Sequence, residues 1–386
     1  MKKVCVITGT RAEYGLLYWT LKALKEDAEI ALQLCVTGMH LSPEFGLTYQ
    51  KIEEDGFTID YKVESLLSAD TGSSIGKSIG LGTIGFADAF QQLTPDLVLV
   101  LGDRFEILAA VIAAMAARIP VGHCHGGEAT EGLIDESIRH SITKMSHLHF
   151  TATDTFSKRV IQLGEQPKNV FCVGALGIEN INKISYRSKQ DLEKIYDITF
   201  LEKNYLITFH SETLSKQSPQ NQFNELLLAL DNVKDDKTFF LFTKPNADNE
   251  GRELISMIDE YVKNNPKNAF AVTSLGQKNY LSALKIVDLV VGNSSSGLIE
   301  VPSFKIPTIN IGERQRGRIK SKSIIDCDVN HESILSAIKK AFDNEFRLEL
   351  KNIKNPYGNS NASHRILEVI KRTNLNSLLK KKFFNQ

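Results

Sequence analysis

The amino-acid sequence predicts an α/β protein built from two doubly wound domains, each a parallel sheet of Rossmann-like topology. Short apolar runs alternate with segments of helical periodicity, the alternation restarts in the second half, and the runs end in polar, glycine-containing loops. Such alternation is typical of right-handed βαβ units, whose parallel sheet is covered by helices on both faces. The length of 386 residues also exceeds what one hydrophobic core usually serves.

In the first half, residues 4–7 form an apolar run that ends at Thr8, and leucines then recur at helical spacing, so we expect a strand followed by a helix over 16–24. His147 and His149 fit a further buried strand or its edge. The other elements expected here are strands over 30–36, 97–101 and 120–123 and helices over 109–117 and from about 134.

The second half repeats the pattern after a polar stretch at 180–201. We expect one domain over 1–182, a second over 183–362, and a C-terminal segment, 363–386, that packs back on the first domain. The elements expected are strands over 204–209, 238–243, 286–291 and 307–311, a helix over 223–230, and a last helix from about 363.

Composition and charge exclude several classes of protein. Lys plus Arg equals Asp plus Glu at 46 each, so no global field favours nucleic acid or an anionic membrane. Five scattered cysteines form no CxxC pair, and no apolar run is long enough for a signal peptide or a membrane span. We therefore expect a soluble cytoplasmic protein with no nucleic-acid or membrane partner.

Two loops suit the binding of phosphate. The first, 8–15, holds Arg11 at the start of a helix, and the second, 292–297, holds Asn293, Ser294 and Ser295. Helix N-termini present unpaired N–H groups to anions. Neither loop matches a P-loop or a GxGxxG motif, so ATP and NAD are not supported.

The loop at 292–297 is followed by two further candidate contacts. Glu300 is placed to accept from ribose hydroxyls, and Arg314 is placed to meet a diphosphate.

The segment 101–140 carries most of the ionisable chemistry. Asp103 and Arg104 follow a strand, and Asp135 and Arg139 lie four residues apart on a helix, where a plain surface ion pair is the alternative. His40 and His210, both at strand ends, are candidate ligand contacts.

A metal site is the other reading of part of this segment. His123, His125 and Glu128 invite it, but no second ligand cluster accompanies them, so we expect no metal.

Taken together, these motifs resemble the UDP-N-acetylglucosamine 2-epimerase family, over residues 3 to about 320. Each motif is weak alone, and their order and spacing make the set specific. The motifs are TGTRAEYG (8–15), TGMH (37–40), GDR (102–104), HGGE (125–128), DESIRH (135–140), FHSETL (209–214), GNSSSG (292–297) and GERQ (312–315).

Within the family, the residues 137–140 and 209–214 look like the hydrolysing branch that makes N-acetylmannosamine for bacterial sialic acid. The resemblance implies a two-domain fold of the GT-B type, with UDP on the C-terminal domain and the sugar in the interdomain cleft. It also implies no metal or nicotinamide cofactor, and a dimer or tetramer. It implies removal of the C2 proton, departure of UDP from C1 to give a 2-acetamidoglucal, and addition of water with inversion at C2.

Site residues follow from the same resemblance. Asp103 and Asp135 match catalytic acid/base groups, and His210 matches a histidine near the leaving group. The remaining matches are Glu128 and Arg139 around the sugar and Arg11, Ser294, Ser295, Glu300 and Arg314 at the nucleotide.

The sequence departs from the family at two positions. His125 stands where other branches carry a catalytic glutamate. Imidazole can also do acid–base work near neutral pH, so the group that deprotonates C2 stays open between His125 and an aspartate. Ser211 stands where proline is common.

Four alternatives also stay open. Two keep the chemistry and change the substrate to UDP-N,N'-diacetylbacillosamine or a GDP-linked sugar. The third is a GT-B glycosyltransferase, and the fourth is a non-catalytic nucleotide-sugar sensor.

Overall fold

The computed structural model of the chain describes residues 1–386 except 68–70, 131–133, 211–216, 246–250, 359–360 and 386. The chain forms two compact units. The first comprises Met1–Glu128, Ile134–Asn180 and Tyr357–Gln386, and the second is built around Ile181–Pro356.

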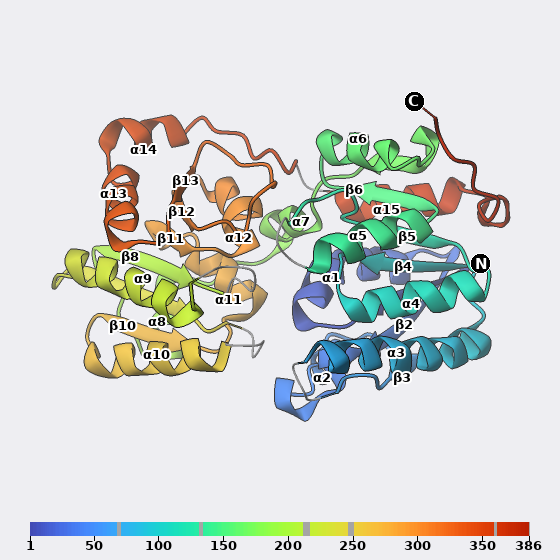
Figure 1. The fold of residues 1–386 in the computed structure, drawn as a ribbon, viewed down its shortest axis with the longest axis horizontal. Helices are drawn as coiled ribbons and strands as arrows, with labels where there is room; N and C mark the ends of the chain where they lie inside the picture. The colour runs from blue at the N-terminus through green and yellow to red at the C-terminus, as the bar shows by residue number, and fades with distance from the viewer. Residues whose placement is uncertain (68–70, 131–133, 211–216, 246–250, 359–360, 386) are drawn as a thin grey trace. The chain divides into compact units, whose positions relative to one another are not determined.

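The first unit is a seven-stranded parallel sheet with the order β3-β2-β1-β4-β5-β6-β7 (Figure 1). The strand order reverses between β1 and β4, as in doubly wound folds. Its strands are β1 (Lys2–Thr8), β2 (Ile30–Thr37), β3 (Tyr61–Val63), β4 (Leu97–Leu101), β5 (Val121–Cys124), β6 (Leu148–Thr151) and β7 (Val170–Cys172). Its helices are α1 (Arg11–Glu26), α2 (Tyr49–Glu54), α3 (Gly72–Leu93), α4 (Phe105–Ala116), α5 (Ile134–Met145), α6 (Asp154–Gln162), α7 (Leu176–Lys183) and α15 (Ala362–Arg372).

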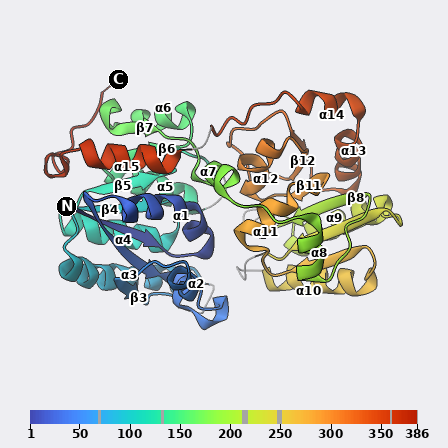
Figure 2. The ribbon, with the colours of Figure 1, turned by 180° about the vertical axis from the view of Figure 1, so that it is seen from behind.

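Successive strand residues feed two separate cores of this unit. Val4 and Val6 of β1 pack in the core beneath α1 and α15, whereas Cys5 and Ile7 pack in the core beneath α3, α4 and α5. Side chains alternate between the faces of a strand, so a strand buried on both faces is apolar throughout. Figure 1 looks onto the second of these faces and Figure 2 onto the first.

The second unit is a six-stranded parallel sheet with the order β10-β9-β8-β11-β12-β13, which reverses between β8 and β11. Its strands are β8 (Lys203–Thr208), β9 (Thr238–Thr243), β10 (Ala269–Val272), β11 (Leu289–Gly292), β12 (Thr308–Ile311) and β13 (Ile324–Cys327). Its helices are α8 (Lys189–Tyr196), α9 (Pro219–Val233), α10 (Gly251–Asn264), α11 (Gly276–Ala283), α12 (Ser295–Ile299), α13 (His331–Ala341) and α14 (Asn344–Leu350). The predicted fold class is confirmed: both halves are doubly wound parallel sheets.

The C-terminal segment belongs to the first unit, although 176 residues of chain, from Ile181 to Pro356, separate it from the rest of that unit. Helix α15 packs against α1, and Lys2 donates to three carbonyls at or beyond its end, those of Ile370, Lys371 and Thr373. At its other end the Glu179 carboxylate accepts from the backbone N–H and the hydroxyl of Ser363. Both ends of α15 are therefore bonded to elements distant in sequence.

Two elements differ from the sequence prediction. No element was predicted over 72–93, where the structure has helix α3, and five glycines weaken the helical signal of this stretch. Strand β11 begins at Leu289, three residues later than predicted, because Ile286 and Val287 fill the core before the strand starts.

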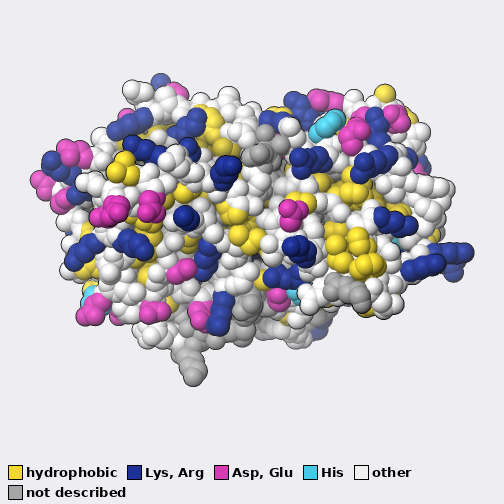
Figure 3. Space-filling view, turned by 90° about the horizontal axis from the view of Figure 1, so that it is seen from above, with side chains coloured by type: hydrophobic (Ala, Val, Ile, Leu, Met, Phe, Trp, Pro, Cys, Tyr) yellow, Lys and Arg dark blue, Asp and Glu magenta, His cyan; other side chains and the backbone are white. Residues whose placement is uncertain are grey.

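None of the helices that the structure describes is long and apolar enough to cross a membrane. Basic and acidic side chains are mixed over the face presented in Figure 3, in line with equal numbers of the two charges.

Candidate active site

The predicted site residues lie where each sheet reverses its strand order. In the first unit the loops after β1 and β4 straddle the reversal, and in the second unit the loops after β8 and β11 do so. Ligands of open α/β sheets bind beyond the carboxyl ends of the strands at such points.

An ion-pair cluster connects the β4 loop with helix α5. The Arg139 side chain, only 1% exposed, pairs with the Asp103 carboxylate through Nη2 and with Glu136 Oε2 through Nη1 at 2.6 Å. The four-residue spacing from Asp135 also allowed a plain surface ion pair, which the burial of the Arg139 guanidinium excludes. Glu136 reaches His140 Nε2 as well, at 3.0 Å. The cluster delivers one buried cation and two carboxylates to the end of β4.

Glu128 and His125 form a second buried pair beside this cluster. His125 Nδ1 lies 2.8 Å from Glu128 Oε1, and both side chains are at most 10% exposed. His125 adopts φ of 65°, a left-handed backbone conformation that few side chains other than Asn, Asp and His adopt.

The loop after β1 is filled by carboxylates of the protein itself. Glu13 accepts from the Gly9 N–H at 2.7 Å, and Arg104 forms two bonds to the fully buried Glu106. Burial raises the pKa of Glu13 to about 7; Arg104 opposes the shift and Glu106 adds to it. The Gly9 amide expected to meet phosphate is thus occupied in this structure.

His40 lies fully buried beneath the same loop. Its Nε2 is 3.0 Å from the Thr8 hydroxyl and its Nδ1 is 2.8 Å from the Thr48 hydroxyl. Burial lowers its pKa to about 4, so the ring is neutral at pH 7. These contacts give His40 a supporting place under the loop rather than a surface for ligand.

Two of the predicted contact residues lie at helix N-termini. Arg11 is exposed at the first position of α1, and Asp135 is partly buried in the first turn of α5.

In the second unit, Asn293 is the centre of the half-site. Its fully buried amide accepts from the His210 N–H and donates to the His210 carbonyl, both at 2.8 Å. Its own carbonyl accepts from Arg314 at 3.1 Å and from Gln315 at 2.8 Å. Gly292 is required just before it, because a Cβ there would lie 1.9 Å from the Thr208 carbonyl oxygen. Asn293 therefore joins the ends of β8 and β11 to the loop after β12.

His210 and the serine loop line this half-site. Burial and the nearby Arg314 guanidinium lower the pKa of His210 to about 3, so its ring carries no charge at pH 7. Ser294 and Ser295 are partly exposed at the start of α12, and the Ser294 side chain does not cap the helix. Residues 211–216, which include Ser211, lie outside the described residues.

The structure adds residues that sequence reasoning did not select. Glu136 holds Arg139, and Tyr280 OH lies 2.6 Å from Ser296 Oγ. Burial, and to a smaller extent the nearby Glu300, raise the pKa of the Tyr280 phenol. Glu136 is adjacent to the predicted Asp135 in the sequence, whereas nothing about Tyr280, at helical spacing inside α11, signals a site. Among the residues described, no group of three or more His, Cys, Asp or Glu side chains is arranged to hold a metal.

Comparisons with known proteins agree with this architecture. The family model for UDP-N-acetylglucosamine 2-epimerase matches residues 22–371. GDP/UDP-N,N'-diacetylbacillosamine 2-epimerase (hydrolyzing) of Campylobacter jejuni is 42% identical over 385 residues, which cover 100% of this chain and 99% of that protein. Polysialic acid biosynthesis protein P7 of Escherichia coli is 42% identical over 371 residues, 96% of this chain and 94% of that protein.

The fold is shared with a solved structure at much lower identity. The S. aureus MnaA–UDP co-structure superposes with a TM-score of 0.81 at 19% identity, covering 100% of both chains. The matched family model and the two relatives span nearly the whole chain. The chain therefore belongs to the UDP-N-acetylglucosamine 2-epimerase family, in its hydrolysing nucleotide-sugar 2-epimerase branch.

Proposed function

We propose that the protein converts UDP-N-acetylglucosamine and water to N-acetylmannosamine and UDP. The observation that carries the proposal is the cluster around the buried Arg139 guanidinium, which pairs with the Asp103 carboxylate and donates to the Glu128 backbone carbonyl at the carboxyl ends of β4 and β5. Removal of a weakly acidic C–H proton needs a positioned carboxylate, and the departing diphosphate needs cations and polar donors. The two half-sites supply these two sets of groups.

The reaction runs in two balanced steps. A carboxylate, Asp103 or Asp135, takes the proton from C2, the C1–O bond to UDP breaks, and a C1=C2 double bond forms. Water then adds its hydroxyl to C1, and a proton returns to C2 from the opposite face, which inverts that centre. Arg139 balances the charge on Asp103, and no cofactor enters either step.

Binding is assigned to the remaining groups. Arg11, Ser294, Ser295 and Arg314 hold the diphosphate, and Glu300 accepts from the ribose. Arg104 faces the sugar side of the first unit. Neutral His210 offers a hydrogen bond to the leaving group while Arg314 supplies charge, because a ring with a pKa of about 3 is not a cation at pH 7.

A second substrate is supported by one of the relatives. The Campylobacter jejuni protein carries GDP/UDP-N,N'-diacetylbacillosamine in its name and is as similar to this chain as the polysialic acid protein P7. The elimination chemistry is the same for both sugars, since they differ at C4 and C6, away from the reacting carbons.

One experiment separates these functions. The protein is incubated in deuterated water with UDP-N-acetylglucosamine, and in parallel with UDP-N,N'-diacetylbacillosamine, and products are followed by NMR. Free N-acetylmannosamine with deuterium at C2, together with UDP, is expected. If only UDP-N,N'-diacetylbacillosamine is turned over, that compound is the substrate. A UDP-N-acetylmannosamine product, release of UDP only with an acceptor sugar, or UDP binding without turnover of either compound contradicts the proposal.

A further inference from the structure

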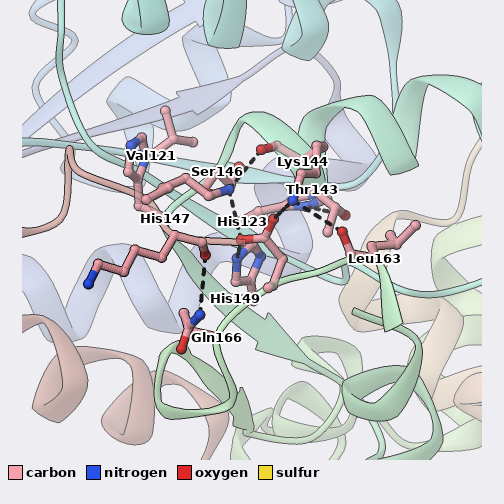
Figure 4. Close-up of polar contacts among 12 residues, drawn as sticks. Val121, His123, Thr143, Lys144, Ser146, His147, His149, Leu163 and Gln166 are labelled. Atoms are coloured by element: carbon pink, nitrogen blue, oxygen red, sulfur yellow. Dashed lines mark hydrogen bonds and ion pairs between the residues drawn. The ribbon is translucent and has the colours of Figure 1, made fainter. Parts of the chain in front are cut away.

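The His123-Cys124-His125 segment places two histidines at the end of β5, and each ring is bonded on both sides. His123 Nε2 lies 2.7 Å from the Gly102 carbonyl oxygen, and its Nδ1 lies 3.1 Å from the Thr143 hydroxyl of α5 (Figure 4). His125 Nε2 accepts from the Leu176 N–H at 3.2 Å, and its Nδ1 faces Glu128.

The partners of His125 define its protonation state. Leu176 donates a backbone N–H to Nε2, so that nitrogen bears no proton, and the single ring proton lies on Nδ1 toward Glu128. If the ring were charged, Nε2 would also carry a proton, and its N–H would face the N–H of Leu176 without an acceptor between them. Proton transfer at Nε2 would therefore cost the bond to Leu176, and the proton on Nδ1 faces only the protein's own carboxylate.

The partners of His123 define the opposite state. A carbonyl oxygen only accepts, so Nε2 carries the proton and Nδ1 accepts from Thr143. Burial also lowers the pKa of His123 to about 3. The packing around this bond is tight, since a Cβ on Gly126 would lie 3.0 Å from both His123 Nδ1 and Thr143 Oγ1.

We propose that His123 and His125 are positioning residues, held as neutral rings of opposite tautomer, and that neither is a proton carrier for the reaction. His123 fixes the turn that presents Asp103, and His125 holds Glu128 while bonding the first N–H of α7. This rests on the proposed function for the roles of Asp103 and Glu128.

The bond to Leu176 also has a consequence for the second unit. The first N–H groups of a helix lack partners within it, and His125 supplies one for α7 as an N-cap side chain does. The chain leaves the first unit within helix α7, since Asn180 belongs to the first unit and Ile181 to the second. His125 thereby connects the Glu128 loop to the segment that leads to the nucleotide half-site.

The protonation states are measured without reference to activity. The protein is labelled with ¹⁵N-histidine, its nine ring systems are observed by NMR at pH 7, and the two signals are assigned with His123→Gln and His125→Gln. We expect His125 to be protonated on Nδ1 only and His123 on Nε2 only. A proton on Nε2 of His125, or a charged ring at either position, overturns the proposal.

The kinetic test compares two variants of His125. Glutamine places a carbonyl oxygen near the position of Nε2 and cannot carry a proton near neutral pH, whereas leucine loses both contacts. We expect His125→Leu to lower kcat about 10- to 100-fold, as for other orienting residues, and His125→Gln to recover most of it with an unchanged kcat–pH profile. If kcat falls equally in both variants, by about 10²- to 10⁴-fold, and one limb of the kcat–pH profile is missing, His125 is a proton carrier instead.

A matched control distinguishes a general effect of losing a buried histidine from the proposed role of His125. His147 is also a buried histidine of the β5–β6 region whose Nδ1 accepts a backbone N–H, from Val121 at 3.1 Å, but it contacts neither site loop (Figure 4). His147→Gln is expected to leave kcat unchanged, and a loss there as large as that of His125→Leu overturns the positioning role. If the wild-type protein turns over neither sugar nucleotide, the proposed function fails while the NMR result still decides the tautomers.

Discussion

At the scale of single residues, the buried guanidinium of Arg139 explains how two separate elements form one acid cluster. Asp103 comes from the loop after β4 and Glu136 from α5, and both bond Arg139, while the Glu128 carbonyl accepts from it at 3.3 Å. A buried cation requires compensating charge, so these elements are held together electrostatically.

Asp103→Asn tests this cluster. The amide keeps the shape of the side chain but cannot take a proton, so we expect turnover to fall by about 10²-fold or more, while UDP affinity changes little because Asp103 is not among the groups assigned to the nucleotide. NMR rates and calorimetric titration with UDP provide the two readouts. Asp88→Asn, on the exposed side of α3, serves as the control. Retained turnover in Asp103→Asn removes that residue from the mechanism.

Sequence reasoning located these residues but not their partners. Polar residues after apolar runs are visible in the sequence, and parallel strands bring their ends to one edge. Which atoms meet depends on side-chain geometry across elements. The buried rings of His40 and His123 illustrate this, since both nitrogens of each are bonded within the protein.

At the scale of elements, α3 shows why propensity fails where packing decides. Its glycines permit close approach: a Cβ on Gly82 would lie 3.0 Å from Ala109 Cβ of α4, and one on Gly85 would lie 2.7 Å from Val63 Cγ1. Phe86 and Phe90 supply the buried apolar area on the same helix. Strands β1, β2, β4 and β9 were predicted because continuous apolar runs need no tertiary information.

Two glycine substitutions in α3 should have opposite effects. Gly85→Ala forces a methyl group against Val63, and we expect the free energy of unfolding to fall by about 1–3 kcal/mol. Gly76→Ala meets no atom within 4 Å, and helix propensity predicts a gain of about 1 kcal/mol. Urea denaturation of each variant measures both. If Gly85→Ala is as stable as Gly76→Ala, the packing explanation of the glycines is wrong.

At the scale of the whole molecule, the two sheets repeat one design. Each presents loops on both sides of its strand-order reversal, acid–base groups in one unit and amide, hydroxyl and arginine groups in the other. This division was predictable, because the motifs recur at equivalent places in the two halves of the sequence. The burial of His147 and His149 was expected from their strand, whereas that of His40 and His123 was not, and these histidines determine how the stability of the molecule varies with pH.

Acid should destabilise the first unit more than the second. Burial lowers the pKa of His40 and His147 to about 4 and that of His123 to about 3 in the first unit, whereas His210 alone shows such a value, about 3, among the described residues of the second. Between pH 6.5 and about 4 these histidines bind protons in the unfolded chain but not in the folded protein, so stability falls as pH falls.

Glu13 opposes this effect, because its pKa near 7 makes the folded state the better proton acceptor between pH 7 and 4.5. The lowered pKa values of four histidines, His40, His123, His147 and His149, outweigh the raised pKa of one carboxyl group. Hydrogen exchange at pH 7.5 and pH 5.0, corrected for intrinsic rates, should therefore show a larger loss of protection in β4–β6 than in β8–β11. His147→Gln should reduce that loss. An equal loss in the two units would mean that the histidines are not neutral in the folded protein.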